Sequence, residues 1–268
     1  NEVVRRVVLF LPIEPAAWRK AEPRAIGQGD VIMCIACQNF ALPRRSFLAL
    51  GAAVAATAAL GGQALAAGAT TSVSADEALA RLKSGNEKFV SAPQLCAADL
   101  GKQRDSIAKA QTPRAAIVGC ADSRTPPELL FGGTGLGELF VARNAGNMAD
   151  TATMGTIEYG AAVLGTPLIV VLGHQRCGAV AAACSVVEKH EKFPGSIGPM
   201  VAAIVPAARA VHGKPGDFVE NAVRESAKRT AAKIVTDSKI VAGLVKAKKV
   251  KVLAAYYDLN SGKVEYLT

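Results

Sequence analysis

Residues 115–124 read AAIVGCADSR, an apolar run that ends at Cys120, Asp122 and Arg124. Residues 168–177 read LIVVLGHQRC, a second apolar run that ends at His174 and Cys177. Short apolar runs of this kind are typical of strands buried on both faces of a parallel sheet. Because such sheets place their sites beyond the carboxyl ends of the strands, we expect both groups of polar side chains at one edge of the same sheet.

Cys120, His174 and Cys177 together offer two sulfur donors and one nitrogen donor, which is a suitable set for zinc. A catalytic zinc normally has three protein ligands and keeps its fourth position for water or substrate. A structural zinc usually has four protein ligands, often from two Cys-x-x-Cys pairs, and no fourth ligand is obvious here. We therefore predict one catalytic Zn²⁺ per subunit rather than a buried histidine and two core cysteines.

The remainder of the chain alternates between expected strands and expected helices, which predicts an α/β fold. Its central sheet should be mostly parallel and flanked by helices, with a helical arm at the N-terminal side. The glycine-rich stretch 132–137 lacks the spacing of a dinucleotide or phosphate loop, so we interpret it as a turn. We expect strands at 115–119, 138–142, 168–173, 251–257 and 263–267, and helices at 74–90, 100–110, 126–130, 152–164, 177–188, 199–211 and 217–249, the last broken near Asp237.

The first part of the chain has the features of an export signal. Arg44 and Arg45 precede an apolar run at 49–60, and Ala64-Leu65-Ala66 matches a small-x-small cleavage pattern. The run is too rich in alanine and glycine for a good membrane anchor. We therefore interpret 1–32 as an upstream extension, 33–66 as a twin-arginine signal peptide and 67–268 as a single zinc-enzyme domain. The protein should then be periplasmic or otherwise exported, with the twin-arginine translocation machinery as a partner during export.

The net charge of +9, from 31 basic and 22 acidic residues, raises the question of nucleic-acid binding. The lysines are spread over helical segments without interleaved aromatic residues for base stacking, so we expect no nucleic-acid partner. Cys96 and Cys184 remain outside the metal set. They form either a disulfide or, as we favour, two free thiols, and export of the folded protein would allow zinc to be loaded before it leaves the reducing cytoplasm.

From about residue 74 to residue 267 the sequence resembles the β-class carbonic anhydrases. Cys-Ala-Asp-Ser-Arg at 120–124 is similar to the family's Cys-x-Asp-x-Arg signature, and the His-x-x-Cys at 174–177 to its second ligand pair. Segments 137–147 and 254–258 also fit. The resemblance implies a zinc lyase in which a zinc-bound hydroxide reversibly hydrates carbon dioxide to bicarbonate and a proton. It also implies a homodimer or homotetramer with the site near the subunit interface.

The resemblance assigns roles to further residues. Asp122 would accept a hydrogen bond from the hydroxide, Arg124 would hold Asp122, and Gln111 would donate to the oxygen that gains charge. The resemblance favours the family's open form, in which water completes the zinc shell, over its closed form, in which the aspartate binds zinc. Residues typical of the open form stand at matching positions: Gln111, Phe140, Tyr159 and Gly178. The expected substrate pocket consists of Phe140, Tyr159 and the backbone N–H of Gly178.

Two other functions remain open on the same residues. The hydroxide could instead hydrolyse carbonyl sulfide or carbon disulfide. A non-catalytic protein that binds zinc or bicarbonate is the second alternative, although the Asp122–Arg124 pair argues against it. A thiol oxidoreductase is weaker, because Cys34 and Cys37 form a Cys-x-x-Cys pair that lies before the twin arginine.

Overall fold

The structure is a computed structural model that describes residues 71–92, 104, 107–108 and 110–267. These residues belong to one compact unit, 62–268. The expected extension, the expected signal peptide and Cys96 lie outside the described residues, as does most of the expected helix at 100–110. Among the described helices, none has both the length and the apolar composition that a bilayer span requires.

A five-stranded sheet with the order β2-β1-β3-β4-β5 forms the centre of the fold. The first four strands in this order are parallel, and β5 is antiparallel to β4. This arrangement confirms the predicted α/β class and the five predicted strands. The strands are β1 (Ala115–Cys120), β2 (Leu139–Asn144), β3 (Leu168–His174), β4 (Lys251–Tyr257) and β5 (Val264–Leu267).

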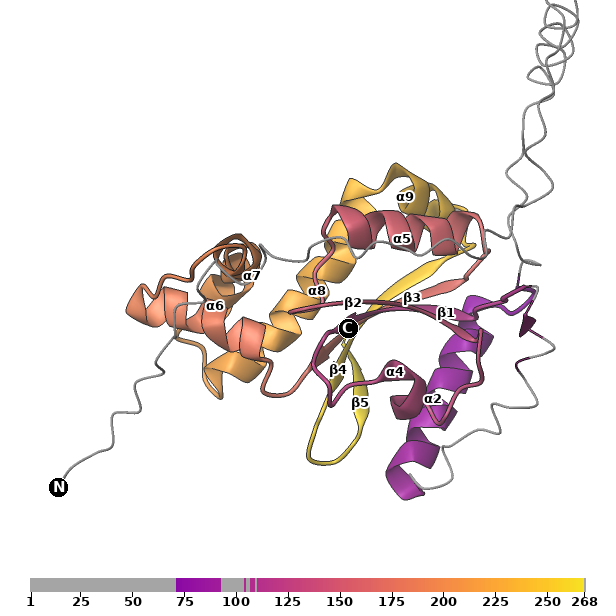
Figure 1. The fold of residues 1–268 in the computed structure, drawn as a ribbon, viewed down its shortest axis with the longest axis horizontal. Coiled ribbons are helices and arrows are strands. Elements are labelled where there is room, and N and C mark those ends of the chain that lie inside the picture. The colour runs from indigo at the N-terminus through magenta and orange to yellow at the C-terminus, as the bar shows by residue number, and fades with distance from the viewer. Residues whose placement is uncertain (1–70, 93–103, 105–106, 109, 268) are drawn as a thin grey trace, which may run out of the picture. The chain divides into compact units, whose positions relative to one another are not determined.

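Helices cover both faces of the sheet, which explains why β1 and β3 are buried along their whole length. On one face, Ala116 and Val118 pack in a core with α5 (Thr151–Ala162), α8 (Phe218–Asp237) and α9 (Lys239–Lys246). On the other face, Ala115 and Ile117 pack with α2 (Ala75–Ser91) and α4 (Pro127–Leu130). Figure 1 shows these two layers on either side of the strands.

A third core lies beyond the carboxyl ends of the strands, where α6 (Gly178–Lys189) and α7 (Ile197–Val211) pack with α8. Cys120, Cys177 and Tyr256 are buried in this core. It surrounds the point at which β1 and β3 end, and so it positions the side chains that the sequence marked as metal ligands.

Helix α2 is the described part of the expected N-terminal arm. Its N-cap is Ser74, whose hydroxyl accepts a hydrogen bond from the backbone N–H of Glu77 at 3.2 Å. Ala78 and Leu82 are fully buried against the sheet, and the Asn86 amide donates to the carbonyls of Leu130 and Gly262. This helix therefore covers one face of the sheet of its own subunit.

Candidate metal centre

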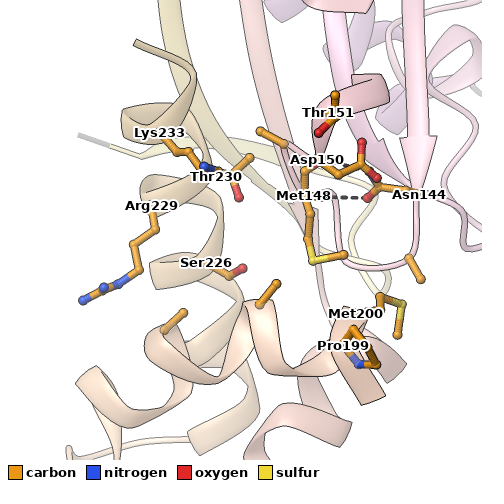
Figure 2. A pocket seen from close by; sticks show the side chains of 14 residues that line it. Asn144, Met148, Asp150, Thr151, Pro199, Met200, Ser226, Arg229, Thr230 and Lys233 are labelled. Atoms are coloured by element: carbon orange, nitrogen blue, oxygen red, sulfur yellow. Dashed lines mark hydrogen bonds between the residues drawn. The ribbon is translucent and has the colours of Figure 1, made fainter. Parts of the chain in front are cut away.

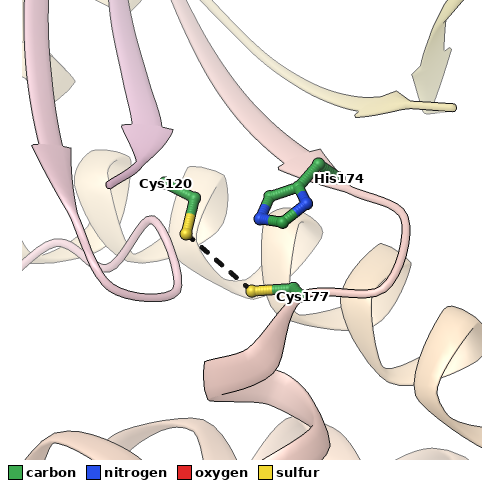
Figure 3. Close-up of side chains that lie close together, drawn as sticks. All are labelled: Cys120, His174 and Cys177. Atoms are coloured by element: carbon green, nitrogen blue, oxygen red, sulfur yellow. Dashed lines mark hydrogen bonds between the residues drawn. The ribbon is translucent and has the colours of Figure 1, made fainter. Parts of the chain in front are cut away.

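Three side chains meet where two neighbouring strands end. Cys120 is the last residue of β1, His174 is the last residue of β3, and Cys177 is the N-cap of α6. Their ligand atoms lie within 4.8 Å of one another, and the two sulfur atoms are 3.9 Å apart. All three side chains are buried and point toward a common centre (Figure 3). The geometry of the sheet thus brings together the three residues that the sequence predicted as ligands.

The hydrogen bonding of His174 fits a metal ligand. Its Nδ1 atom lies 2.9 Å from the carbonyl oxygen of Gln175, to which an Nδ1–H donates. That tautomer leaves a lone pair on Nε2, which is buried and has no hydrogen-bond partner. Two sulfurs bound at 2.3 Å to a tetrahedral zinc would lie about 3.8 Å apart, close to the observed separation. The donor set and its geometry therefore fit zinc.

The two thiols differ in their tendency to ionise. A hydrogen bond with Cys177 lowers the pKa of Cys120, and the backbone N–H of Gly146, which donates to the Cys120 sulfur at 3.4 Å, acts in the same direction. The pKa of Cys177 is raised because Cys120 lies beside it and because it is buried. Without a metal these opposite shifts favour ionisation of Cys120 over that of Cys177, and a dication favours the ionised form of both thiols.

Asp122 lies beside the three ligands and is held by Arg124. The backbone N–H and Nε of Arg124 both donate to Oδ1 of Asp122 at 2.9 Å, and Nη2 donates to Oδ2 at 2.6 Å. These bonds keep the pKa of Asp122 well below its usual range. Oδ2 also lies 3.9 Å from Nε2 of His174. An ionised hydrogen-bond acceptor is thus fixed next to the donor atoms that face the common centre.

The described structure also shows two contacts that the sequence did not assign. Gly146, which donates to the Cys120 sulfur, has φ +84°, and a Cβ there would lie 2.6 Å from Cδ1 of Ile204. Arg143 donates to the backbone carbonyls of Cys120 and Asp122. Both residues lie in segment 137–147, which resembles the family's central segment, and that likeness was the available signal.

Three other predicted site residues lie at the opposite end of the sheet. Phe140 pairs with Ala116 near the start of β1, whereas Cys120 pairs with Asn144, about 13 Å further along β2. Tyr159 packs against Phe140 with ring centroids 6.2 Å apart, and the Gln111 side chain lies beside Gly137. Within one chain these three residues therefore do not reach the metal centre.

Gly178 does lie next to the metal centre. It is the first residue of α6, directly after Cys177, and a Cβ placed on it would meet nothing within 4 Å. The backbone N–H groups of a helix's first turn have no partner within the helix, so they are available to a substrate. Gly178 therefore lies beside the candidate ligands, and its role in binding substrate stays a prediction.

A cavity of about 610 Å³ is lined by residues of α7, of α8 and of the segment 144–151 (Figure 2). Met148, Met200 and Ser226 contribute to its lining. Within the segment 144–151, the backbone N–H of Gly146 donates to the Cys120 sulfur, whereas Met148 lines the cavity. Cys120, His174 and Cys177 do not line it, so we do not place the chemistry there.

Comparison with known proteins covers both the metal centre and the fold. Residues 115–264 match a family model described as carbonic anhydrase. A carbonic anhydrase of Mycolicibacterium smegmatis is 36% identical over 184 residues, which is 69% of this chain and 89% of the relative.

Solved structures with the same fold are similar as well. A Coccomyxa β-carbonic anhydrase in complex with acetazolamide is 27% identical, covers 70% of this chain and 86% of its own, and has a TM-score of 0.55. A tetrameric β-carbonic anhydrase from Sordaria macrospora shares the fold at 23% identity, with 62% of this chain and 90% of that chain covered and a TM-score of 0.53.

Proposed function

This chain belongs to the β-class carbonic anhydrase family, and we propose that Cys120, His174 and Cys177 are the ligands of its zinc. The enzyme catalyses the reversible hydration of carbon dioxide to bicarbonate and a proton, with zinc as its cofactor. The observation that carries the ligand assignment is the buried, unpartnered Nε2 of His174 beside two sulfur atoms 3.9 Å apart.

The residues around the zinc site have separate roles in the reaction. Bound zinc supplies the positive charge that makes a water molecule acidic near neutral pH. Asp122, ionised and held by Arg124, accepts the hydrogen of the attacking oxygen and directs its lone pair toward the carbon of carbon dioxide. The N–H of Gly178 is positioned to hold a substrate oxygen.

The position of Asp122 supports the open form of the site. Both carboxylate oxygens of Asp122 accept hydrogen bonds from Arg124. The cluster of ligand atoms within 4.8 Å of one another consists of Cys120, His174 and Cys177 and does not include Asp122. We therefore assign the fourth zinc position to water or substrate.

We further propose that a second copy of the chain supplies Gln111, Phe140 and Tyr159 to each site. Strand β2 is at the edge of the described sheet, so its outer side is free to pair. Two β2 edges related by a two-fold axis run antiparallel, which would place the Phe140 end of one strand beside the Asn144 end of the other. A homodimer, alone or within a tetramer, would then complete two sites.

Export through the twin-arginine machinery is a further part of the proposal and rests on Arg44, Arg45 and the apolar run that follows. Changing both arginines to lysine should leave the unprocessed protein in the cytoplasm of a bacterial host with this pathway. Fractionation followed by detection of the mature chain in the periplasm tests this, and unimpaired export of the variant would contradict it.

The main test of the function combines metal content with gas-specific assays. Purified mature protein should contain one zinc per subunit and should hydrate carbon dioxide in a stopped-flow experiment. Parallel assays of carbonyl sulfide and carbon disulfide hydrolysis separate the alternatives. Activity on these two gases without carbon dioxide hydration would show the hydrolase, and zinc without any of the three activities would show a binding protein.

A further inference from the structure

We propose that Arg143 is a positioning residue that fixes the backbone between the zinc ligand Cys120 and the catalytic Asp122. Its Nε donates to the carbonyl oxygen of Cys120 at 2.7 Å, and its Nη2 donates to the carbonyl oxygen of Asp122 at 2.5 Å. One guanidinium therefore holds two peptide groups that lie on either side of Ala121. This inference rests on the proposed function.

The register of the sheet explains how Arg143 reaches this segment. Arg143 on β2 pairs with Gly119 on β1, one residue before the ligand. A Cβ on Gly119 would lie 3.9 Å from Cγ of Arg143, so the stem of the arginine passes close along β1. The next pair of the ladder is Cys120 with Asn144, and beyond it Ala121 N–H donates to the Asn144 carbonyl at 3.0 Å. Three hydrogen bonds from the end of β2 therefore hold residues 120–122: two from Arg143 and one at Asn144.

The shape of the arginine side chain suits this task. Guanidinium is planar and presents its donors as a rigid fork, whereas the ammonium of lysine is a compact point charge. The hydrogen bond to the Cys120 carbonyl is partly buried, and a carbonyl shielded from water costs free energy when it loses its donor. Without the guanidinium the backbone between Cys120 and Asp122 is more mobile, and the Cys120 sulfur and the Asp122 carboxylate shift with it.

Two arginines therefore have different roles at this site. The Arg124 side chain orients the Asp122 carboxylate by donating hydrogen bonds to both of its oxygens. Arg143 orients the peptide backbone that carries both this carboxylate and the Cys120 sulfur. Loss of Arg143 should consequently weaken zinc binding as well as turnover, whereas Arg124 acts on the carboxylate alone.

The test measures zinc affinity by chelator competition, together with kcat/KM and the melting temperature, in the full mature protein. For Arg143→Ala we expect zinc affinity and kcat/KM each to fall about 10–100-fold, the usual range for residues that support metal ligands. Arg143→Lys should fall between this variant and the wild type. Millimolar guanidinium chloride should restore part of the zinc affinity of Arg143→Ala, because it returns the missing donors. Arg81→Ala, which removes an exposed arginine from α2, is the matched control.

Two results would overturn the inference. One is a zinc affinity of Arg143→Ala equal to that of Arg81→Ala. The other is an equal loss in the lysine and alanine variants that guanidinium leaves unchanged, since this would reflect a general loss of stability. If Arg143→Ala does not fold, the lysine variant decides, because its zinc affinity should still fall below the wild-type value. A wild-type protein that binds zinc without hydrating carbon dioxide would defeat the proposed function, yet the zinc comparison would still decide the role of Arg143.

Discussion

The two ends of the β1–β2 pair differ in how much of the expected site one chain provides there. At the carboxyl end all three candidate ligands are buried, and His174 and Cys177 are each only 1% exposed. At the amino end, Tyr159 is 44% exposed and rests on Phe140 at the free edge of the sheet. The comparison shows that one chain brings its three candidate ligands together by itself, whereas Tyr159, which we propose to act in the site of a second copy, is exposed. The predictions below test this division.

The largest effect is expected at the carboxyl end, where one chain supplies all three candidate ligands. Cys177→Ser should reduce bound zinc from one per subunit to almost none and abolish hydration, because the site loses one of its two thiolates. Metal analysis of the purified variant and stopped-flow hydration measure both quantities. A variant that kept its full zinc content would contradict the ligand assignment.

Asp122→Asn should separate metal binding from chemistry at the same end. The amide cannot act as the ionised acceptor, so we expect zinc to remain bound while kcat falls at least about 100-fold. Zinc content and stopped-flow rates on the same sample test this. Wild-type turnover with full zinc would remove Asp122 from the mechanism.

Gln111→Ala probes the opposite end of the sheet. We expect hydration to slow by about 100-fold with zinc unchanged, as for the loss of one oxyanion donor.

Mixing Gln111→Ala subunits with Cys177→Ser subunits tests whether the partner supplies Gln111. If the partner supplies Gln111, half of the randomly paired dimers are mixed and each has one intact site of two, so activity should recover to about a quarter of the wild-type value. No recovery on mixing would mean that each chain uses its own Gln111.

The smallest effect concerns the metal-free protein. The lowered pKa of Cys120 predicts a thiolate below neutral pH, detectable by absorbance at 240 nm and absent in Cys120→Ser. The folded-state pKa lies below the unfolded one, so the thiolate's contribution to stability is present above the unfolded pKa of about 8.5 and is lost as pH falls through the folded pKa. Burial raises the pKa of Cys184 to about 11, which keeps this thiol neutral. Equal absorbance in wild type and Cys120→Ser at pH 7 would contradict this prediction.

The sequence was sufficient for the strands and for the metal centre because both depend on local patterns. Apolar runs identified β1 and β3, and the residues at their ends indicated Cys120, His174 and Cys177 as candidate ligands, which the structure brings within 4.8 Å of one another. Parallel strands place their carboxyl ends at one edge of the sheet, and these ends meet because β1 and β3 are neighbours in it.

Other features depend on pairing and register, which periodicity does not contain. The role of Arg143 follows from its position opposite Gly119, and the distance of Phe140 from the ligands follows from its position opposite Ala116, near the start of β1. The N–H of Gly146 reaches the Cys120 sulfur only because the turn after β2 has a positive φ. Resemblance to a family indicated the segment that holds these residues, but only the structure shows which atoms they contact.

The hydrogen bond between His174 and the backbone carbonyl of Gln175 affects the reactivity of the metal that His174 would bind. Its Nδ1–H donates to the neutral carbonyl of Gln175 and not to a carboxylate. A carboxylate would push more electron density through the ring toward the bound ion. Two thiolates already reduce the electrophilicity of zinc, so a weakly donating imidazole preserves part of the Lewis acidity on which turnover near neutral pH depends.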